Sequence, residues 1–363
     1  MCEMTPKQRL LASIRGQEVD HVPFSPFLVY YFDFLPNDVR EKGELSYLQQ
    51  MGADPLLRGG VCAYEIRQNH CTVSVRTEGN KRYETITTPK GNLYSEYTYV
   101  SQANTWFLTR HPIADASQIP AAIAYFEDLQ VIEKIKEANE QVERLGEDGL
   151  QLALVGTHMK SAYQYLLENF VGTENLIYLT MDEPELLDEL LAVMQKKNLE
   201  TVQITAKSNV SACISWEDSS TTNVNPALYQ TYIAPEITRW CTMLNEAGKP
   251  YVQHACGHIK HLLSPMAAQG VSAIESISPA PTGNVTMAEA FEELPAQVSL
   301  IGGIEPTQIL NDSVSSLLEY ADMLLSIRKN RGFILANSDS CPPGVDYEKF
   351  VALANFLKQR TVH

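Results

Sequence analysis

Hydrophobic positions in the second half of the chain follow two alternating patterns. Short apolar runs typical of buried strands alternate with longer segments in which apolar residues recur at helical spacing. The predicted strands cover residues 150–156, 210–216, 251–255, 271–277, 298–304 and 332–338. Strands that alternate with amphipathic helices indicate a parallel sheet, because each parallel connection must cross back over the sheet.

Two earlier strands bring the predicted number to eight. Residues 21–31, "HVPFSPFLVYY", predict a buried strand interrupted by prolines, and residues 52–61, "GADPLLRGGV", predict a second one. Eight strands alternating with helices favour a (β/α)8 TIM barrel. A doubly wound open sheet is the alternative, but it usually carries a glycine-rich phosphate loop after its first strand, and this sequence has none.

Residues 5–16 predict a lead-in helix before the first strand. Its signals are the N-cap Thr5, the following Pro6, Gln8 as the second member of a capping box, and Gly16 as the stop. A long charged helix is expected over about 121–145.

Residues 71–100 follow a different pattern from the rest of the chain. Polar residues alternate there with β-branched or aromatic ones, and turn signals occur at 78–80 and 90–92. This pattern predicts an antiparallel β-hairpin insertion, which we place at about 64–110 within a single barrel domain of residues 1–363.

The composition narrows the classes of function. The 44 acidic residues outnumber the 28 basic ones, and a net charge of −16 argues against binding to nucleic acid or to an anionic membrane. The sequence has neither a run of about 20 apolar residues nor the pattern of a signal peptide, so we expect a cytoplasmic protein. Its cysteines are odd in number and lack disulfide-framework spacing, which predicts free thiols or metal ligands at Cys2, Cys62, Cys71, Cys213, Cys241, Cys256 and Cys341.

Reactive side chains gather at the predicted carboxyl ends of the strands, where barrel enzymes carry their active sites. They are His158, Glu217, Asp218, His254, Cys256, Glu275, Glu305, Asp339 and Cys341. His254 and Cys256 are two residues apart and therefore point to the same side of an extended chain. Cys341 follows the last strand and reaches the same rim of a closed barrel.

One imidazole and two thiolates, from His254, Cys256 and Cys341, form a soft donor set that suits tetrahedral Zn²⁺. Three protein ligands leave a fourth position open, as in catalytic zinc sites. A thiol that entered this position would lose its proton more readily and become a nucleophile. The sequence therefore predicts a zinc site with one open position, at which a bound thiol would be activated.

Several of these residues have a structural alternative. A His-x-Cys pair is more often a core cysteine beside a partly buried histidine. Glu217 and Asp218 are either functional acids at the rim or an N-cap and a solvated acid before the next helix, and His158 has a similar choice. Glu275 is either a buried, hydrogen-bonded residue or a fourth zinc ligand. His258 and His261 are expected on a solvated helix face and not as ligands.

Several segments resemble the uroporphyrinogen decarboxylase superfamily, and within it the zinc-dependent corrinoid methyltransferases that include methylcobamide:coenzyme M methyltransferases. The resemblance rests on "TPKQRLLASIRGQEVDHVP", "GADP", "HACG", "GVSAIESI", "LIGGIEP" and "GFILANSDSCPPGVDYEKF". It implies a (β/α)8 barrel with zinc bound by His254, Cys256 and Cys341. It also implies transfer of a methyl group between a corrinoid (methylcobalamin or a methylcobamide) on a partner protein and a thiol such as coenzyme M. Glu217, Asp218 or His158 could orient the acceptor or take its proton.

The sequence departs from the decarboxylase branch at the loop after the first strand. That branch has two arginines in this loop, and Val29 and Asp33 take their places here. A substrate with many carboxylates would lose its cationic partners. The late Gly-His-Gly is also replaced, by "SDS" with Asp339. Two alternatives to methyl transfer stay open: a decarboxylase-like enzyme acting on a tetrapyrrole, and a non-catalytic barrel with a structural zinc.

Overall fold

The structure is a computed structural model, and it describes residues 3–102 and 104–360. Cys2 lies outside the described residues. The chain forms two compact units, of which the first comprises Met1–Ala63, Ile135–Leu154 and Thr205–His363. The second comprises Tyr64–Lys134 and Val155–Ile204. Among the described residues, no helix combines the length and the apolar character needed to cross a membrane.

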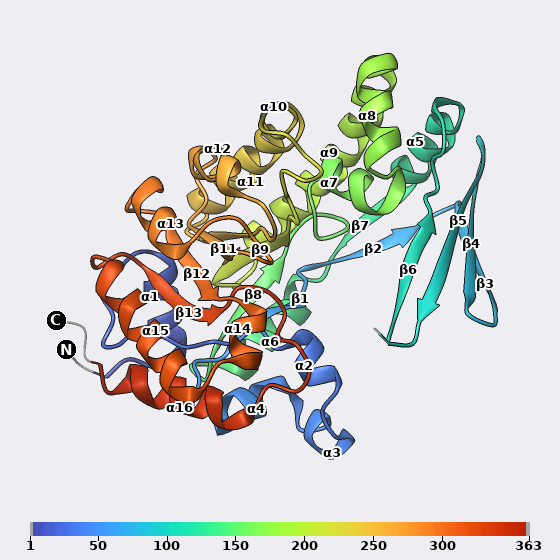
Figure 1. Cartoon of the computed structure of the whole chain (residues 1–363). Coiled ribbons are helices and arrows are strands. Elements are labelled where there is room, and N and C mark those ends of the chain that lie inside the picture. Colours follow the sequence, from blue (N-terminus) through green and yellow to red (C-terminus); the bar gives the residue numbers. More distant parts are fainter. Residues whose placement is uncertain (1–2, 103, 361–363) are drawn as a thin grey trace. The chain divides into compact units, whose positions relative to one another are not determined.

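The first unit contains a curled parallel sheet in the order β1-β8-β9-β10-β11-β12-β13. Most of these strands are labelled in Figure 1. Its strands are β1 (Leu56–Val61), β8 (Leu150–Leu154), β9 (Ala212–Trp216), β10 (Tyr251–His254), β11 (Ala273–Ile277), β12 (Ser299–Ile304) and β13 (Phe333–Asn337). All these strands pair in parallel, and each lies within a segment that the hydrophobic pattern had marked as a strand.

The eighth position of the barrel is filled by the segment around Phe24. Ser25 donates its backbone N–H to the carbonyl of Leu335 at 2.9 Å, and the N–H of Leu335 reaches the carbonyl of Pro23 at 3.0 Å. On the other side, the N–H of Asp54 donates to the carbonyl of Phe24 at 2.8 Å. Phe24 and Leu335 form an isolated bridge here, and Pro23 and Pro26 beside it lack the N–H that a longer ladder requires. The predicted (β/α)8 barrel is confirmed, with a shortened first strand.

Helices connect the strands of this sheet along the chain. Those of the first unit are α1 (Pro6–Ile14), α2 (Val29–Asp33), α3 (Asn37–Arg40), α4 (Gly43–Gln50), α6 (Ile135–Leu145), α10 (Pro226–Leu228), α11 (Ala234–Glu246), α12 (Leu263–Ala268), α13 (Met287–Glu293), α14 (Pro306–Asn311), α15 (Val314–Ile327) and α16 (Tyr347–Lys358). α1 begins with the predicted capping box of Thr5 and Gln8. Its carbonyl at Ser13 accepts a hydrogen bond from the hydroxyl of Ser299 at 2.8 Å, which ties α1 to the amino end of β12.

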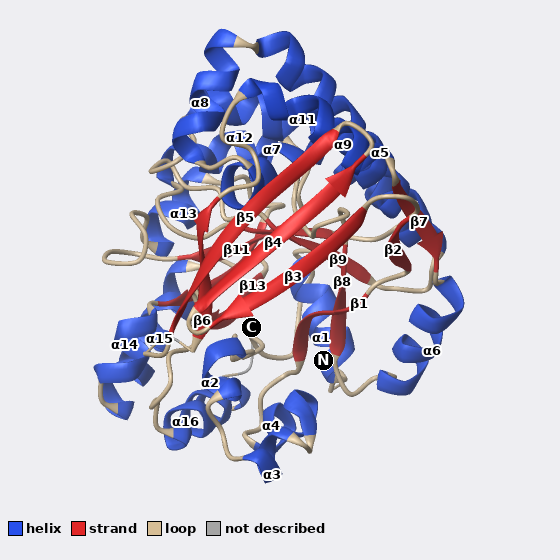
Figure 2. Ribbon diagram, turned by 90° about the vertical axis from the view of Figure 1, so that its right-hand side faces the viewer, coloured by secondary structure: helices blue, strands red, loops and turns tan. Residues whose placement is uncertain are grey.

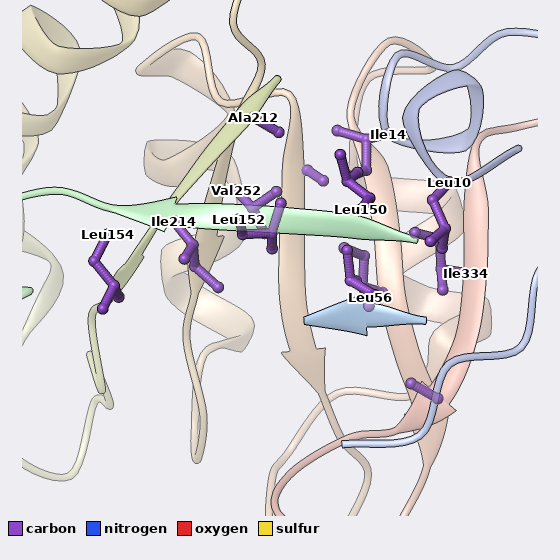
Figure 3. Packing of buried hydrophobic residues seen from close by; sticks show 13 residues of the cluster. Leu10, Ile14, Leu56, Leu150, Leu152, Leu154, Ala212, Ile214, Val252 and Ile334 are labelled. Carbon is purple, nitrogen blue, oxygen red and sulfur yellow. The ribbon is translucent and has the colours of Figure 1, made fainter. Parts of the chain in front are cut away.

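The barrel interior is filled by apolar side chains that alternate along each strand. Leu56 of β1, Leu152 of β8, Ile214 of β9 and Val252 of β10 are each fully buried and belong to one cluster. Figure 3 shows these side chains together with Leu10 of α1. Because successive side chains in a strand point to opposite faces, this cluster defines which residues of each strand face inward.

The second unit carries the antiparallel sheet that the sequence predicted as an insertion. Strands β3 (Thr72–Glu78), β4 (Lys81–Thr88), β5 (Gly91–Val100) and β6 (Thr105–Arg110) pair in chain order, and Figure 2 shows β3, β4 and β5 side by side. A separate pair joins β2 (Tyr64–Gln68) and β7 (Leu129–Glu133). Helices α5 (Ile119–Glu127), α7 (Ala162–Tyr165) and α8 (Thr173–Asp182) belong to this unit, while α9 (Pro184–Lys207) runs past its end.

Two local predictions are wrong. The helix expected over 121–145 is divided into α5 and α6 by β7, whose β-branched Val131 and Ile132 pair with β2. The carboxylate of Asp128 accepts backbone hydrogen bonds from residues 69–71 and fixes this break. The strand expected over residues 21–31 ends early, and its last part forms the short helix α2.

Candidate functional site

The carboxyl end of β9 separates the two neighbouring acids predicted at the rim. Ile214 faces the barrel core and Trp216 packs against it, so the intervening Ser215 faces outward. Glu217 shares the outward side, is fully buried, and accepts a hydrogen bond from the Ser215 hydroxyl at 2.9 Å. The side chain of Asp218 instead lies near Nε2 of His254 and Sγ of Cys256. Neither acid caps the following helix, because Asn225 fills that position.

The carboxyl end of β10 brings the His-x-Cys pair to the same interior side. Val252 belongs to the barrel core, and His254 follows it on the inward face. Gln253 points the other way and donates to the hydroxyl of Tyr229 at 2.9 Å. His254 is the register partner of Trp216 on β9 and of Glu275 on β11.

Three possible metal ligands converge at this rim. Ligand atoms of Asp218, His254 and Cys256 all lie within 4.8 Å of one another. Nε2 of His254 is 3.6 Å from Oδ1 of Asp218, and Sγ of Cys256 lies 3.4 Å from the same oxygen. One nitrogen, one sulfur and one carboxylate oxygen are donor types that zinc accepts in proteins. The residues present therefore fit a zinc ion.

The other nitrogen of His254 faces a buried carboxylate. Nδ1 lies 3.1 Å from Oε2 of Glu275, and Nε of Arg58 donates to Oε1 of the same carboxylate. Burial opposes ionisation of Glu275, but the charge of Arg58 and the hydrogen bond with His254 lower its pKa to about 2. An ionised carboxylate can only accept, so Nδ1 is the donor and Nε2 is the nitrogen that faces Asp218 and Cys256.

The same surroundings shift the pKa of the imidazole. Burial opposes protonation of His254, but the hydrogen bond with Glu275 and the negative charges of Glu275, Asp218 and Asp339 outweigh it. The pKa of His254 is therefore raised above its usual value. The pKa of Asp339 is also raised, by burial and by the neighbouring carboxylates of Asp218 and Glu275.

Two aromatic rings pack against the imidazole of His254. Trp216 meets the imidazole of His254 edge to face, with ring centroids 4.8 Å apart. Phe27 does the same at 5.8 Å and stacks on Trp216 at 5.6 Å. The guanidinium of Arg58 lies 5.0 Å from the centre of the Phe27 ring, as in a cation–π contact. These rings limit the access of water to the imidazole.

Cys341 is not a member of the described group within 4.8 Å. It follows β13, its backbone N–H donates to the carbonyl of Phe27 at 2.7 Å, and its Sγ lies 3.7 Å from the carbonyl of Pro342. Burial raises the pKa of this thiol to about 12. None of the described cysteines forms a disulfide.

His158 belongs to the second unit. Its ring stacks on Tyr165 with centroids 3.9 Å apart, and its Nδ1 lies 3.0 Å from the hydroxyl of Thr157. Burial lowers the pKa of His158 to about 4, so the imidazole is neutral at pH 7. Glu305, another acid predicted at the rim, serves in the first unit as the N-cap of α14 and accepts from the backbone of Thr307 and Gln308.

Arg58 was missed as a site residue, although the sequence contains a signal for it. It stands two residues after Leu56, on the inward side of an otherwise apolar strand. A buried arginine requires an anionic partner, so its position predicts an interior carboxylate. The identity of that carboxylate, Glu275, depends on the order of strands around the barrel.

Comparisons with known proteins agree with this architecture. The sequence model for uroporphyrinogen decarboxylase (URO-D) matches residues 123–360, which is more than half of the chain. A solved methyltransferase from Methanosarcina mazei superposes with a TM-score of 0.65 and 16% sequence identity, covering 98% of this chain and 99% of that one. This likeness shows a shared fold.

Weaker similarity extends to a B12-independent methionine synthase from Shewanella in complex with selenomethionine, with a TM-score of 0.43, 8% identity and coverage of 93% and 97%. A putative vitamin-B12 independent methionine synthase from Listeria monocytogenes gives a TM-score of 0.40, 11% identity and coverage of 95% and 97%. No curated protein matches the chain by sequence. The extent of the family match, together with the barrel, leads to the conclusion that the chain belongs to the uroporphyrinogen decarboxylase family.

Proposed function

We propose that this protein is a zinc-dependent methyltransferase that moves a methyl group between a corrinoid carried by a partner protein and a small-molecule thiol such as coenzyme M. The observation that carries the proposal is the convergence of Asp218, His254 and Cys256 within 4.8 Å at the carboxyl ends of β9 and β10. Membership of the family and the fold shared with a methyltransferase support it.

The zinc ligands proposed are His254 through Nε2, Cys256 and Cys341. His254 and Cys256 belong to the three residues whose ligand atoms lie within 4.8 Å of one another. Cys341 is proposed because its loop resembles that of the methyltransferase branch. When bound, zinc would stabilise the thiolate of the acceptor relative to the thiol and so supply a nucleophile at neutral pH. Trp216 and Phe27 would limit the access of water to the imidazole of His254.

Asp218 is the acid best placed to take the proton of the acceptor thiol. Its side chain is 37% exposed, so it can exchange protons with solvent, and its Oδ1 already lies 3.4 Å from a sulfur atom, Sγ of Cys256. Glu217 points away from this group and is fully buried. His158, neutral at pH 7, is kept as a second candidate for orienting the acceptor.

The proposed transfer is a displacement at carbon. The acceptor sulfur forms a bond to the methyl carbon while the carbon–cobalt bond of the methyl-corrinoid breaks. Both electrons of the broken bond stay on cobalt, which leaves as Co(I), and the thiol proton passes to Oδ1 of Asp218.

Two alternatives make different forecasts. A decarboxylase acting on a tetrapyrrole would use cationic side chains for the substrate carboxylates, yet α2 has Val29 and Asp33 where that branch has arginines. Its activity would survive removal of zinc. In a non-catalytic barrel, a structural zinc would only support folding: its loss would lower the free energy of unfolding, and no activity would depend on it.

The test is demethylation of free methylcobalamin by the zinc-loaded protein with a series of thiols, including coenzyme M, followed by the absorbance of the cobalt product. We expect thiol-dependent demethylation that disappears with a chelator and returns with zinc. Cys256→Ser should abolish it, while substitution of Cys241, a buried cysteine outside the site, should not. Demethylation that is indifferent to the chelator, or absent with every thiol, would contradict the proposal.

A further inference from the structure

Arg58 makes more polar contacts than a simple ion pair requires. Its side chain is 3% exposed, and its Nε donates to Glu275. The remaining nitrogens donate to three backbone carbonyls: Nη2 to Ser25 at 3.1 Å, and Nη1 to Leu56 at 3.3 Å and to Pro26 at 3.4 Å. The guanidinium is therefore held by backbone carbonyls of its own strand, β1, and of residues 25–26. It also contacts Glu275 on β11.

We propose that Arg58 is a positioning residue for the metal centre: by holding Glu275 it fixes the ring of His254 so that Nε2 faces Asp218 and Cys256. The inference rests on the proposed function, because it concerns the same centre. It assigns a role to a residue that touches none of the proposed metal ligands.

The geometry of the Glu275 carboxylate supports this role. One oxygen, Oε1, accepts from Arg58, and the other, Oε2, lies 3.1 Å from Nδ1 of His254. With both oxygens engaged, the carboxylate cannot turn toward the metal without breaking a buried charged hydrogen bond. Glu275 is thus an outer partner of the imidazole, and not the fourth ligand that the sequence had left open.

The buried position of Glu275 makes this support necessary. Its side chain is 4% exposed, and Arg58 donates to its Oε1. Without that donor the carboxylate would keep a buried oxygen that has lost its partner, and it would gain from turning away from Nδ1 of His254. Such a turn would remove the acceptor that holds Nδ1–H in place.

The test compares Arg58→Met, Arg58→Lys and a matched control, Arg9→Met. Arg9 also forms a buried pair, with Asp54, but at the amino end of the barrel, and its side chain is 5% exposed. We expect Arg58→Met to weaken zinc binding by about 10- to 100-fold, the range typical of a lost outer partner, in competition with a chromophoric chelator. Arg58→Lys, which keeps the charge but has a single donor group, should lie between it and wild type.

Arg9→Met should leave the zinc affinity within about threefold of wild type, even if its thermal stability falls as much as that of Arg58→Met. Equal losses of zinc affinity in the two Met variants would mean a general effect on the barrel and would overturn the inference. So would an unchanged affinity in Arg58→Met. If Arg58→Met does not fold, the zinc affinity of Arg58→Lys is the deciding measurement. An affinity equal to that of wild type would then overturn the positioning role of Arg58.

A second readout does not depend on zinc. In the metal-free protein, at a pH where the imidazole is neutral, the ring nitrogens of His254 report by NMR which one carries the proton. We expect a single form protonated at Nδ1 in wild type and in Arg9→Met, and a mixture of both forms in Arg58→Met. Wild type that binds no zinc would end the proposed function, whereas an unchanged His254 spectrum in Arg58→Met would end this inference.

Discussion

Nδ1 of His254 lies 3.1 Å from Oε2 of Glu275, and the two residues are register partners on β10 and β11. The contact is therefore a consequence of strand pairing, because paired inward-facing residues on neighbouring strands are brought side by side. It leaves Nε2 of His254 directed toward Asp218 and Cys256. The order of strands in the barrel thus determines which nitrogen can serve a metal.

Replacing Glu275 with Gln tests this contact directly. The amide carries no charge to pair with Arg58 and binds Nδ1–H less strongly, so we expect zinc affinity to fall by about 10- to 100-fold. Glu289→Gln is the control, because its carboxylate pairs with Lys260 on the surface, where both side chains are 41% exposed. Affinities measured by chelator competition that are the same for both variants would refute the expectation.

Asp218→Asn and Cys341→Ser distinguish the candidates for the third zinc ligand. We predict that cobalt(II), bound in place of zinc, shows sulfur-to-cobalt absorption from two thiolates in wild type and from one in Cys341→Ser. Asp218→Asn should still show the absorption from two thiolates. The measurement is the intensity of this absorption per bound cobalt. The intensity of one thiolate in wild type would exclude Cys341 and leave Asp218 as the third ligand.

His158 should make the stability depend on pH. Its pKa falls from 6.5 to about 4 on folding, because burial disfavours the charged ring. Between these values the unfolded chain binds a proton that the folded chain does not, so stability falls as the pH drops through this window and is unaffected above it. Relative to His158→Gln, wild type should lose on the order of 2 kcal/mol of unfolding free energy between pH 7 and pH 5.

Urea denaturation of both proteins at the two pH values measures this difference. The subtraction removes the contribution of other groups, such as His21, whose pKa is also lowered to about 4 by burial. A wild-type and a variant protein that lose equal stability between pH 7 and pH 5 would show that His158 is not buried in a neutral form.

Leu152→Ala tests the barrel core. Leu152 is fully buried among the inward-facing residues of β1, β9 and β10 (Figure 3). Removing its side chain leaves a cavity, and we expect the free energy of unfolding to fall by about 2–5 kcal/mol. Met323→Ala, at a position 41% exposed on α15, should change it by less than about 0.5 kcal/mol. Equal free energies of unfolding for the two variants, measured by denaturation, would contradict this packing.

The architecture was predictable because the hydrophobic pattern is local. Apolar runs such as 210–216 and 251–255 marked strands that the structure places at Ala212–Trp216 and Tyr251–His254. The capping residues of α1 were also readable, since a capping box depends on residues three apart. The predictions failed where a distant partner decides, as in β7, which interrupts a helical pattern because it pairs with β2.

The candidate site was predictable only in part for the same reason. The two-residue spacing of His254 and Cys256 places both on one side without knowledge of the fold. The choice between Glu217 and Asp218 required the inward face of β9, and the pairing of Arg58 with Glu275 required the arrangement of β1 and β11 in the closed barrel. No local pattern contains that information.

The most direct test of the account is the zinc content of the purified wild-type chain after it is loaded with zinc and freed of excess metal. The account predicts one zinc ion retained per chain in wild type and none in His254→Ala with Cys256→Ser, while the double variant stays folded by circular dichroism. Wild-type protein that retains no zinc, or a double variant that retains as much as wild type, would contradict it.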